Sequence, residues 1–289
     1  MICLRWFGFS LLLSLAIPSA AAQTVIHDAN ITFTTIDVPG AGYTGIFGIN
    51  TAGDMVGNYG QNTNQDSYGF LYRNGTFTYF DYPGQSVTVP TGINDSGVIV
   101  GYAGTEPVVG FLYDGTTFTT IKHGSDSATF TDGINNAGEV VGGTGTIYTT
   151  KGFAMLGGRF KPLNVQGGYV YVYGSGVNNF GTVVGWTDYD GFVCRHGACQ
   201  ILDFPGASKT EALGINDTGV VVGWYNPGNS YSYAFVRRNG KYLSFGYPGA
   251  VFTGAAGINN SGQIVGQYTF DDIAWHGFVT NPITAVDFR

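Results

Sequence analysis

The sequence predicts an all-β protein, a six-bladed β-propeller built from six four-stranded repeats, each about 42 residues long. The first observation is a pattern, G-[IV]-N-x-x-G-x-x-V-G, that occurs six times, with spacings of 44, 41, 43, 38 and 43 residues between successive starts. Such spacings match the length of one propeller blade. The second observation is the presence of 47 glycines, which leave hardly any segment long enough for a stable helix. The six copies begin at Gly48, Gly92, Gly133, Gly176, Gly214 and Gly257.

Each repeat divides into four short strands, called a to d. In the second repeat, strand a covers residues 88–93 and strand b covers the apolar run 98–102. The step between them, residues 94–97, has the Asn and Gly of a tight hairpin, because Asn bonds its own backbone and Gly accepts a positive φ. Turn geometry therefore explains the repeated Asn and Gly without a ligand.

Strand c carries a repeated Gly-Phe, such as Gly69-Phe70, whose Phe we assign to the core. Strand d follows a second tight turn and often ends in D-x-P-G, where Pro stops the ladder at an outer edge. Residues 31–37 resemble a strand d that no strands a to c precede. We therefore predict that this N-terminal strand closes the ring by pairing with the sixth blade near residues 275–280, alongside or in place of the run 284–288.

The first 22 residues have the features of a secretory signal: Arg5, an apolar run over residues 7–17, Pro18 and small residues up to Ala22. We divide the chain into a signal peptide, residues 1–22, and a single β-propeller domain, residues 23–289. No later segment has the ~18 uninterrupted apolar residues of a membrane helix. We expect a monomer without membrane insertion that is secreted to the periplasm, the cell surface or the medium.

The charge balance argues against nucleic acid as a partner. The formal net charge is −7 at pH 7, and removal of Arg5 with the signal makes it more negative. Phosphate backbones are bound by clustered Lys and Arg, and the sequence has no such cluster.

The repeats resemble the extracellular HAF repeats, named after a His-Ala-Phe tripeptide in strand c. His276-Gly277-Phe278 is the nearest match, and it follows an I-N-x-x-G-x-[IV]-V-G element as in that family. Gly replaces Ala in five copies, and one copy alone has His. The resemblance covers nearly all of the chain after the signal. It implies a secreted or surface-exposed repeat protein, and it transfers no catalytic residue.

Propeller geometry places the a-to-b and c-to-d turns on one side, the turn face, and the b-to-c loops and d-to-a crossovers on the other, the loop face. The loop face varies most between repeats, and binding residues tend to lie on variable loops held by a rigid scaffold. Three Trp residues lie there, in copies four and six beside acids, and such aromatic platforms beside carboxylates suit sugars. The candidate ligand-binding residues are Trp186, Asp188, Asp190, Trp224, Tyr225, Asp271, Asp272, Trp275 and His276. Tyr43, Asp66, Glu106, Tyr169 and Glu211 are further candidates from the same face.

Two function classes stay open. The leading hypothesis is a non-enzymatic binding or surface-interaction module that recognises carbohydrate or another extracellular ligand on the loop face, around blades four to six. The alternative is a polysaccharide hydrolase or lyase that uses acids of that face. An enzyme is expected to have one or two deep acids with strongly perturbed pKa values near the central channel, whereas a repeated binder is expected to have similar shallow sites on several blades.

No catalytic motif supports the enzyme, since the chain has no G-x-S-x-G and no H-E-x-x-H. We assign no catalytic residue, no metal ligand and no cofactor. A Ca²⁺ site in the acidic loop of Asp188 and Asp190 stays as a weak alternative, because the EF-hand spacing is absent.

Cys194 and Cys199 flank the c-to-d turn of the fourth repeat. If His196 and Gly197 form the turn, the two cysteines face each other on neighbouring strands as a non-hydrogen-bonded pair, where side chains are closest. An oxidising compartment then favours a disulfide. A two-cysteine metal site is the alternative, and it lacks further soft ligands.

Overall fold

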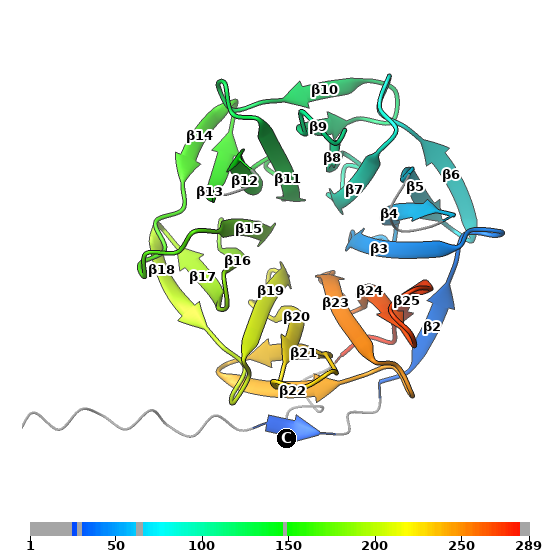
Figure 1. The fold of residues 1–289 in the computed structure, drawn as a ribbon, viewed down its shortest axis with the longest axis vertical. Coiled ribbons are helices and arrows are strands. Elements are labelled where there is room, and N and C mark those ends of the chain that lie inside the picture. The colour runs from blue at the N-terminus through cyan, green and yellow to red at the C-terminus, as the bar shows by residue number, and fades with distance from the viewer. Residues whose placement is uncertain (1–24, 28–30, 62–65, 147–148, 284–289) are drawn as a thin grey trace, which may run out of the picture.

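The computed structural model describes residues 25–27, 31–61, 66–146 and 149–283. Six four-stranded antiparallel sheets surround a central axis like the blades of a propeller, with strand a innermost and strand d outermost (Figure 1). The predicted fold class is confirmed. The described ranges contain no helix, and so none that is long and apolar enough to cross a membrane. The predicted signal peptide and the run 284–288 lie outside the described residues.

The first three blades follow the chain directly. Blade one consists of β3 (Tyr43–Ile49), β4 (Met55–Gly60), β5 (Tyr68–Arg73) and β6 (Thr76–Phe80). Blade two consists of β7 (Thr88–Ile93), β8 (Ile99–Ala103), β9 (Val109–Tyr113) and β10 (Phe118–Ile121). Blade three consists of β11 (Ala128–Ile134), β12 (Val140–Thr146), β13 (Thr149–Leu156) and β14 (Arg159–Pro162).

The last three blades complete the ring. Blade four consists of β15 (Val172–Val177), β16 (Val183–Thr187), β17 (Gly191–Arg195) and β18 (Ala198–Leu202). Blade five consists of β19 (Lys209–Ile215), β20 (Val221–Asn226), β21 (Tyr233–Arg238) and β22 (Lys241–Phe245). Blade six consists of β23 (Phe252–Ile258), β24 (Ile264–Thr269), β25 (Trp275–Thr280) and β2 (Phe33–Ile36).

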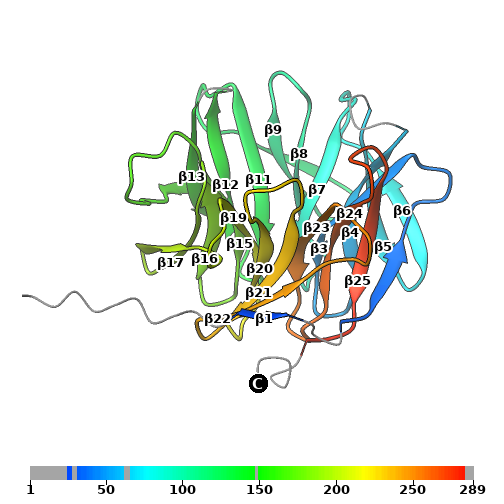
Figure 2. The same ribbon diagram turned by 60° about the horizontal axis from the view of Figure 1, so that its bottom comes forward.

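The N-terminal strand closes the ring, as predicted. β2 pairs antiparallel with β25, from Phe33 opposite Thr280 to Ile36 opposite Gly277. Beyond the strand, Asp37 accepts the Gly277 N–H at 3.2 Å. The sequence did not predict β1 (Val25–His27), which adds a parallel fifth strand to β22 at the outer edge of blade five (Figure 2).

The Phe of strand c forms the core between blades, as predicted. Phe70, Phe111, Phe192, Phe235 and Phe278 are completely buried, and Phe153 of blade three is almost so. Branched aliphatic residues of strand b, such as Val184 and Val222, are also completely buried. Because each strand b lies between two neighbouring blades, its side chains are apolar on both faces.

The Gly that opens each repeat lies where the innermost strands of neighbouring blades approach closely. At Gly176, a Cβ would lie 2.7 Å from the carbonyl oxygen of Leu213 and 3.2 Å from the Cα of Gly214. Real Cβ atoms do not approach backbone so closely, and therefore only Gly fits. The repeated Gly is a packing requirement of the narrow end of each blade.

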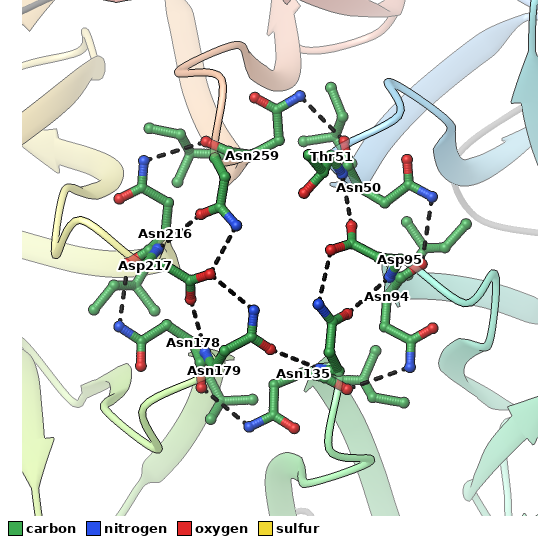
Figure 3. Close-up of a pocket in the computed structure, with 18 residues that line it drawn as sticks. Asn50, Thr51, Asn94, Asp95, Asn135, Asn178, Asn179, Asn216, Asp217 and Asn259 are labelled. Carbon is green, nitrogen blue, oxygen red and sulfur yellow. Dashed lines mark hydrogen bonds between the residues drawn. The ribbon is translucent and has the colours of Figure 1, made fainter.

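The repeated Asn has two roles, of which the sequence predicted one. Within its own turn, Asn178 Oδ1 accepts the backbone N–H groups of Phe180 at 3.1 Å and Thr182 at 3.0 Å. Its Nδ2 donates to the carbonyl oxygen of Asn216 in the next blade at 3.1 Å. The last Asn, Asn259, donates to Asn50 of the first blade at 3.1 Å, so that a closed circle of hydrogen bonds, the Asn belt, joins all six blades (Figure 3). Its members are Asn50, Asn94, Asn135, Asn178, Asn216 and Asn259.

The predicted disulfide is present between Cys194 and Cys199. The two residues face each other in the ladder of β17 and β18, with their Cα atoms 4.0 Å apart. His196 and Gly197 form the turn with φ values of 50° and 84°, as a two-residue hairpin with positive φ at both positions requires.

Candidate functional site

The central channel has a distinct composition at each end. At the turn face, its mouth is a hollow of about 70 Å³ lined by the Asn belt and by the residue that follows each belt Asn (Figure 3). These residues bond to one another: Asp95 accepts the Thr51 N–H at 2.8 Å and the Asn136 Nδ2 at 2.7 Å. The polar groups of this mouth therefore serve to connect neighbouring blades.

A β-bulge in every blade places one residue at the middle of the channel. In each a-to-b pair, the register shifts at the residue before the repeated Gly. Bulges re-aim a side chain out of the ladder. The six bulge residues line a mid-channel cavity of about 80 Å³ and are, from blade one to blade six, Phe47, Thr91, Asp132, Ser175, Leu213 and Ala256.

These six positions divide the channel into two halves. Thr91, Asp132 and Ser175 come from the consecutive blades two to four and form a polar half. Leu213 and Ala256 of blades five and six continue to Phe47 of blade one and form an apolar half. The channel is therefore amphipathic across its width, with a single carboxylate on the polar side.

Asp132 is the most unusual of the bulge residues. Although the residue as a whole is half-buried, its Oδ2 is closed off from solvent and has no hydrogen-bond partner among the described residues. Burial raises the pKa of the Asp132 carboxyl to about 7. Its negative charge also helps burial to raise the pKa values of Tyr102 and Tyr173, which places all three groups in one neighbourhood. A buried carboxylate without a donor is costly, and it calls for an explanation.

Above this level, on the loop face, aromatic side chains form an arc from blade two to blade six, called the aromatic arc. The Tyr102 ring packs on Phe130 with ring centres 5.1 Å apart, and Tyr173 lies between Phe130 and Trp186, 4.4 Å from the latter. The arc continues through Trp224, Phe252 and Trp275, with centre distances of 5.5 and 5.1 Å between successive rings.

Lys209 bridges the middle of the arc. Its ammonium group lies 5.6 Å from the ring centre of Trp186 and 5.3 Å from that of Trp224, within cation–π range of both. Glu211 bonds to Lys209 Nζ at 2.8 Å and to Trp224 Nε1 at 3.0 Å. The Trp residues of blades four and five are thus held by partners within the protein.

A cavity of about 660 Å³, the vestibule pocket, opens where the arc is interrupted, over blades six, one and two. Here small residues replace the bulky side chains of the other blades: Gly254 and Gly45 occupy the positions that hold Phe130 and Tyr173 in blades three and four. The lining combines rings with amide, hydroxyl and carboxylate groups. It consists of Tyr43, Phe47, Asn58, Ser67, Val87, Val89, Tyr102, Thr105, Gln267, Asp272 and Trp275.

Three side chains pack closely against Gly45, and two of them present amide oxygens. A Cβ at this position would lie 2.8 Å from Phe47 Cζ, 2.9 Å from Gln267 Oε1 and 3.0 Å from Asn58 Oδ1. The Asn58 amide is oriented by its Nδ2, which donates to Ser67 Oγ at 2.7 Å. Neighbouring blades therefore present paired hydrogen-bond acceptors beside the rings of the pocket.

Of the nine sequence-predicted ligand residues, the structure brings Asp272 and Trp275 into this pocket. Trp186 and Trp224 belong to the same arc and lie outside the pocket lining. The pocket is centred on blades six, one and two, whereas the sequence placed the ligand around blades four to six.

The acids of blade four hold loops in place. Asp188 accepts the backbone N–H groups of Val170 at 2.9 Å and Tyr171 at 3.2 Å. Asp190 accepts the hydroxyl of Tyr169 at 2.6 Å, a bond that raises the pKa of Tyr169 to about 12. Both carboxylates tie the crossover before β15 to the b-to-c loop. The described residues contain no group of acidic, His and Cys side chains with the arrangement of a metal site.

The three remaining candidates also have internal partners. The Tyr225 ring is buried and its hydroxyl bonds to Ser244 Oγ at 2.8 Å. Asp271 caps its own loop by accepting the N–H groups of Ile273 and Ala274, which lower the pKa of its carboxyl. His276 bonds to Asp37 at 2.7 Å beside the closing strand.

Sequence reasoning did not single out Phe47, Asn58, Tyr102, Asp132 or Gln267. A signal for some of them is present in the repeats. The residue before each repeated Gly varies freely, while the motif after it is nearly constant. A position that varies within a strict repeat indicates a side chain that does not pack between blades as the repeated residues do.

No protein-family profile and no curated protein matches the chain. Solved structures with the same fold include TolB from Acinetobacter baumannii, which is 12% identical with a TM-score of 0.54. The match covers 79% of this chain and 56% of the length of TolB. The Aleuria aurantia lectin in complex with Fucα1-6GlcNAc is 13% identical, with a TM-score of 0.53 over 83% of this chain and 93% of the lectin. A gluconolactonase from Xanthomonas campestris is 11% identical, with a TM-score of 0.51 over 83% of this chain and 87% of the enzyme. At these identities, the comparisons show a propeller fold and nothing finer.

Proposed function

We propose that this protein is a secreted, non-enzymatic carbohydrate-binding propeller, and that the vestibule pocket is its principal binding site. The observation that carries the proposal is the composition of that pocket. Tyr43, Tyr102 and Trp275 offer ring surfaces, while Asn58, Gln267 and Asp272 offer hydrogen-bond acceptors. Sugars have apolar faces that stack on rings and hydroxyl groups that need such acceptors.

The size of the cavity also supports a binding site. A volume of about 660 Å³ lies within the range of ligand pockets, which is roughly 300 to 1,000 Å³. The Aleuria aurantia lectin, solved with a fucosylated disaccharide, shows that another six-bladed propeller binds glycans.

The disulfide between Cys194 and Cys199 supports location outside the cytoplasm, where disulfides persist. Membership of the HAF repeat group is part of the same proposal, and it rests on the repeat motif and on the Gly-Phe of strand c.

The second candidate function, a polysaccharide hydrolase or lyase, is favoured by one observation. Asp132 is a deep acid with a perturbed pKa beside the central channel, as expected of an enzyme. Hydrolysis of a glycosidic bond requires a pair of carboxyl groups about 5 to 10 Å apart, and the polar half of the channel contains a single one. Binding therefore remains the better-supported function.

The test is a glycan array with the chain from residue 23, followed by calorimetry on any hit. Trp275→Ala is expected to weaken binding by about 1 to 3 kcal/mol, with unchanged folding. Phe180→Ala is the matched control, since this ring is 71% exposed on the turn face, and its affinity should equal that of the unmodified protein. Equal affinity of Trp275→Ala would contradict the proposal, and release of reducing sugar from the hit would favour the enzyme.

A further inference from the structure

A second cavity, of about 420 Å³, lies between blade three and the crossover that leads into it from blade two. We call it the blade-three pocket. Its lining combines the ring of Phe160 with four polar side chains, those of His123, Asp126, Thr144 and Lys151. It has no lining residue in common with the vestibule pocket, so the two are separate sites.

The cavity lies where other blades have a pair of stacked rings. Thr144 lies opposite Thr129 in the a-to-b ladder, the position that Tyr225 has in blade five. In blade five the Tyr225 ring stacks on the crossover residue Phe204 with ring centres 3.6 Å apart, and blade six has the same kind of pair. Blade three has a Thr in place of this Tyr, and the Thr lines the cavity.

His123 is the crossover residue of blade three. Its N–H bonds to Thr129 Oγ1 at 3.1 Å, as the corresponding N–H does in blade five. The imidazole Nδ1 lies 2.8 Å from Asp126 Oδ2, and the same oxygen accepts the Thr144 hydroxyl at 2.9 Å. These bonds from His123 and Thr144 lower the pKa of the Asp126 carboxyl, which is therefore ionised and accepts only.

This arrangement leaves one nitrogen of His123 open to a ligand. Because Asp126 accepts from Nδ1, the neutral ring presents Nε2 as an acceptor. Nε2 has no hydrogen-bond partner among the described residues, and the side chain is 45% exposed. The pocket therefore offers an oriented acceptor that a ligand hydroxyl can reach.

Lys151 is a cation without an ion-pair partner among the described residues. It precedes the Gly-Phe of strand c, the position that His276 has in blade six, where Asp37 bonds to that His at 2.7 Å. Blade three has the uncharged Asn164 at the position of Asp37. The exposed ammonium group of Lys151 thus lines a cavity in which the acid of blade six is missing.

We propose that the blade-three pocket binds the uronic acid unit of an acidic saccharide, with its carboxylate on Lys151 and one of its hydroxyl groups on His123 Nε2. A simple anion would use Lys151 alone, whereas a uronate has both groups on one ring and an apolar face that suits the Phe160 ring. The net charge of −7 repels anions at long range. Preference for an acid therefore has to come from the site itself. The inference goes beyond the proposed function, because it adds a second site with its own ligand class.

The experiment compares a galacturonic acid trimer with its methyl ester by calorimetry at neutral pH and low ionic strength. The two ligands have the same hydroxyl groups and differ in charge. The acid is expected to bind about tenfold more tightly, because the ester cannot accept a charge-assisted bond from Lys151. Lys151→Met removes the charge and should abolish this preference. His123→Phe, which introduces the residue type of blade five, should weaken binding of both ligands about tenfold by removing the hydroxyl acceptor.

Two further variants test the cavity and the charge. Thr144→Tyr introduces the residue type of blades five and six and should remove binding of both ligands by filling the space. Lys151→Met decides the question if this variant fails to fold, since Lys151 is exposed. Arg195→Gln is the control for general charge, because it removes an exposed cation from blade four. It should change the affinity for the acid less than about threefold.

The outcomes separate this inference from the proposed function. Equal binding of acid and ester, absence of binding by both, or a preference that survives Lys151→Met would overturn the inference and leave the vestibule pocket untouched. A preference that is lost in Trp275→Ala and kept in Lys151→Met would place the acid in the vestibule pocket, against this inference and in support of the proposed function. Binding of the acid as described, with no glycan bound at the vestibule pocket, would overturn the proposed function alone.

Discussion

The Asn belt makes a prediction about the stability of the ring. Asn178→Ala removes three hydrogen bonds: two within the turn, from Phe180 and Thr182, and one across the blade boundary to Asn216. Asn178 is buried, so water does not replace the lost partners fully. At about 1 kcal/mol net for each bond, the free energy of unfolding should fall by about 3 kcal/mol.

Asn178→Asp separates the two contributions. The carboxylate keeps an oxygen acceptor for the two turn N–H groups, and it loses the donor to the Asn216 carbonyl oxygen. The variant also places a negative charge near the Asn216 carbonyl oxygen. The loss in free energy of unfolding for this variant therefore measures the connection between the two blades. We expect a loss of about 1 to 3 kcal/mol, the range for leaving a buried acceptor unpaired.

Urea unfolding followed by fluorescence measures these differences. Gln200→Ala is the control, because Gln200 is exposed on the outer strand β18, and such surface changes usually stay within about 0.5 kcal/mol. A loss below about 1 kcal/mol for Asn178→Ala, or no loss for Asn178→Asp, would refute the view that the belt holds the blades together.

Three further predictions concern the narrow end of the blades, the disulfide and the channel carboxyl. Gly176→Ala should destabilise the fold by about 1 to 3 kcal/mol through overpacking against the next blade, and unchanged unfolding would contradict the close approach. Replacing Cys194 and Cys199 by Ser should lower the unfolding free energy by about 2 kcal/mol, and two titratable thiols in the native protein would refute the bridge. Because the pKa of Asp132 is raised by folding, wild-type stability should fall as pH rises from about 4 to 7, by up to about 4 kcal/mol. Asp132→Asn should therefore gain stability relative to wild type over this pH range in thermal unfolding, and a pH-independent difference would contradict the burial of this group.

Much of the architecture could be predicted from the sequence because its determinants are local. The repeated Asn and Gly specify a turn within four residues, and Cys194 and Cys199 flank a two-residue hairpin. The closing strand was also predictable, because residues 31–37 repeat the pattern of an outer strand without the inner strands that should precede it.

The position of the pocket was not predictable in the same way, because it depends on which blades ring closure brings together. The lining residues come from blades one and two and from blade six, which is distant from them in the chain. Ring closure brings Tyr43 and Trp275 to one cavity from opposite ends of the sequence. The candidate acids of blade four lie beside a Trp, the pattern expected of a sugar site. In the structure their carboxylates bond to loop backbone and to Tyr169. Only the three-dimensional contacts separate an acid that holds a loop from one that is free to bind a ligand.

The Asn belt shows a similar limit. Asn178 Oδ1 has a role that local sequence explains, whereas its Nδ2 bonds to a residue 38 positions later. The repetition of this Asn in every blade therefore has two causes, the geometry of its own turn and the hydrogen bond to the next blade. The second cause is seen only when neighbouring blades are placed in the structure.

The most direct measurement is a crystal structure of the chain from residue 23 with the tightest-binding glycan from the array. The account predicts electron density for a sugar ring in the vestibule pocket, stacked on Trp275 or Tyr102 and bonded to Asn58 and Gln267. Sugar bound on the turn face or at an outer blade edge, with the vestibule pocket empty, would contradict it.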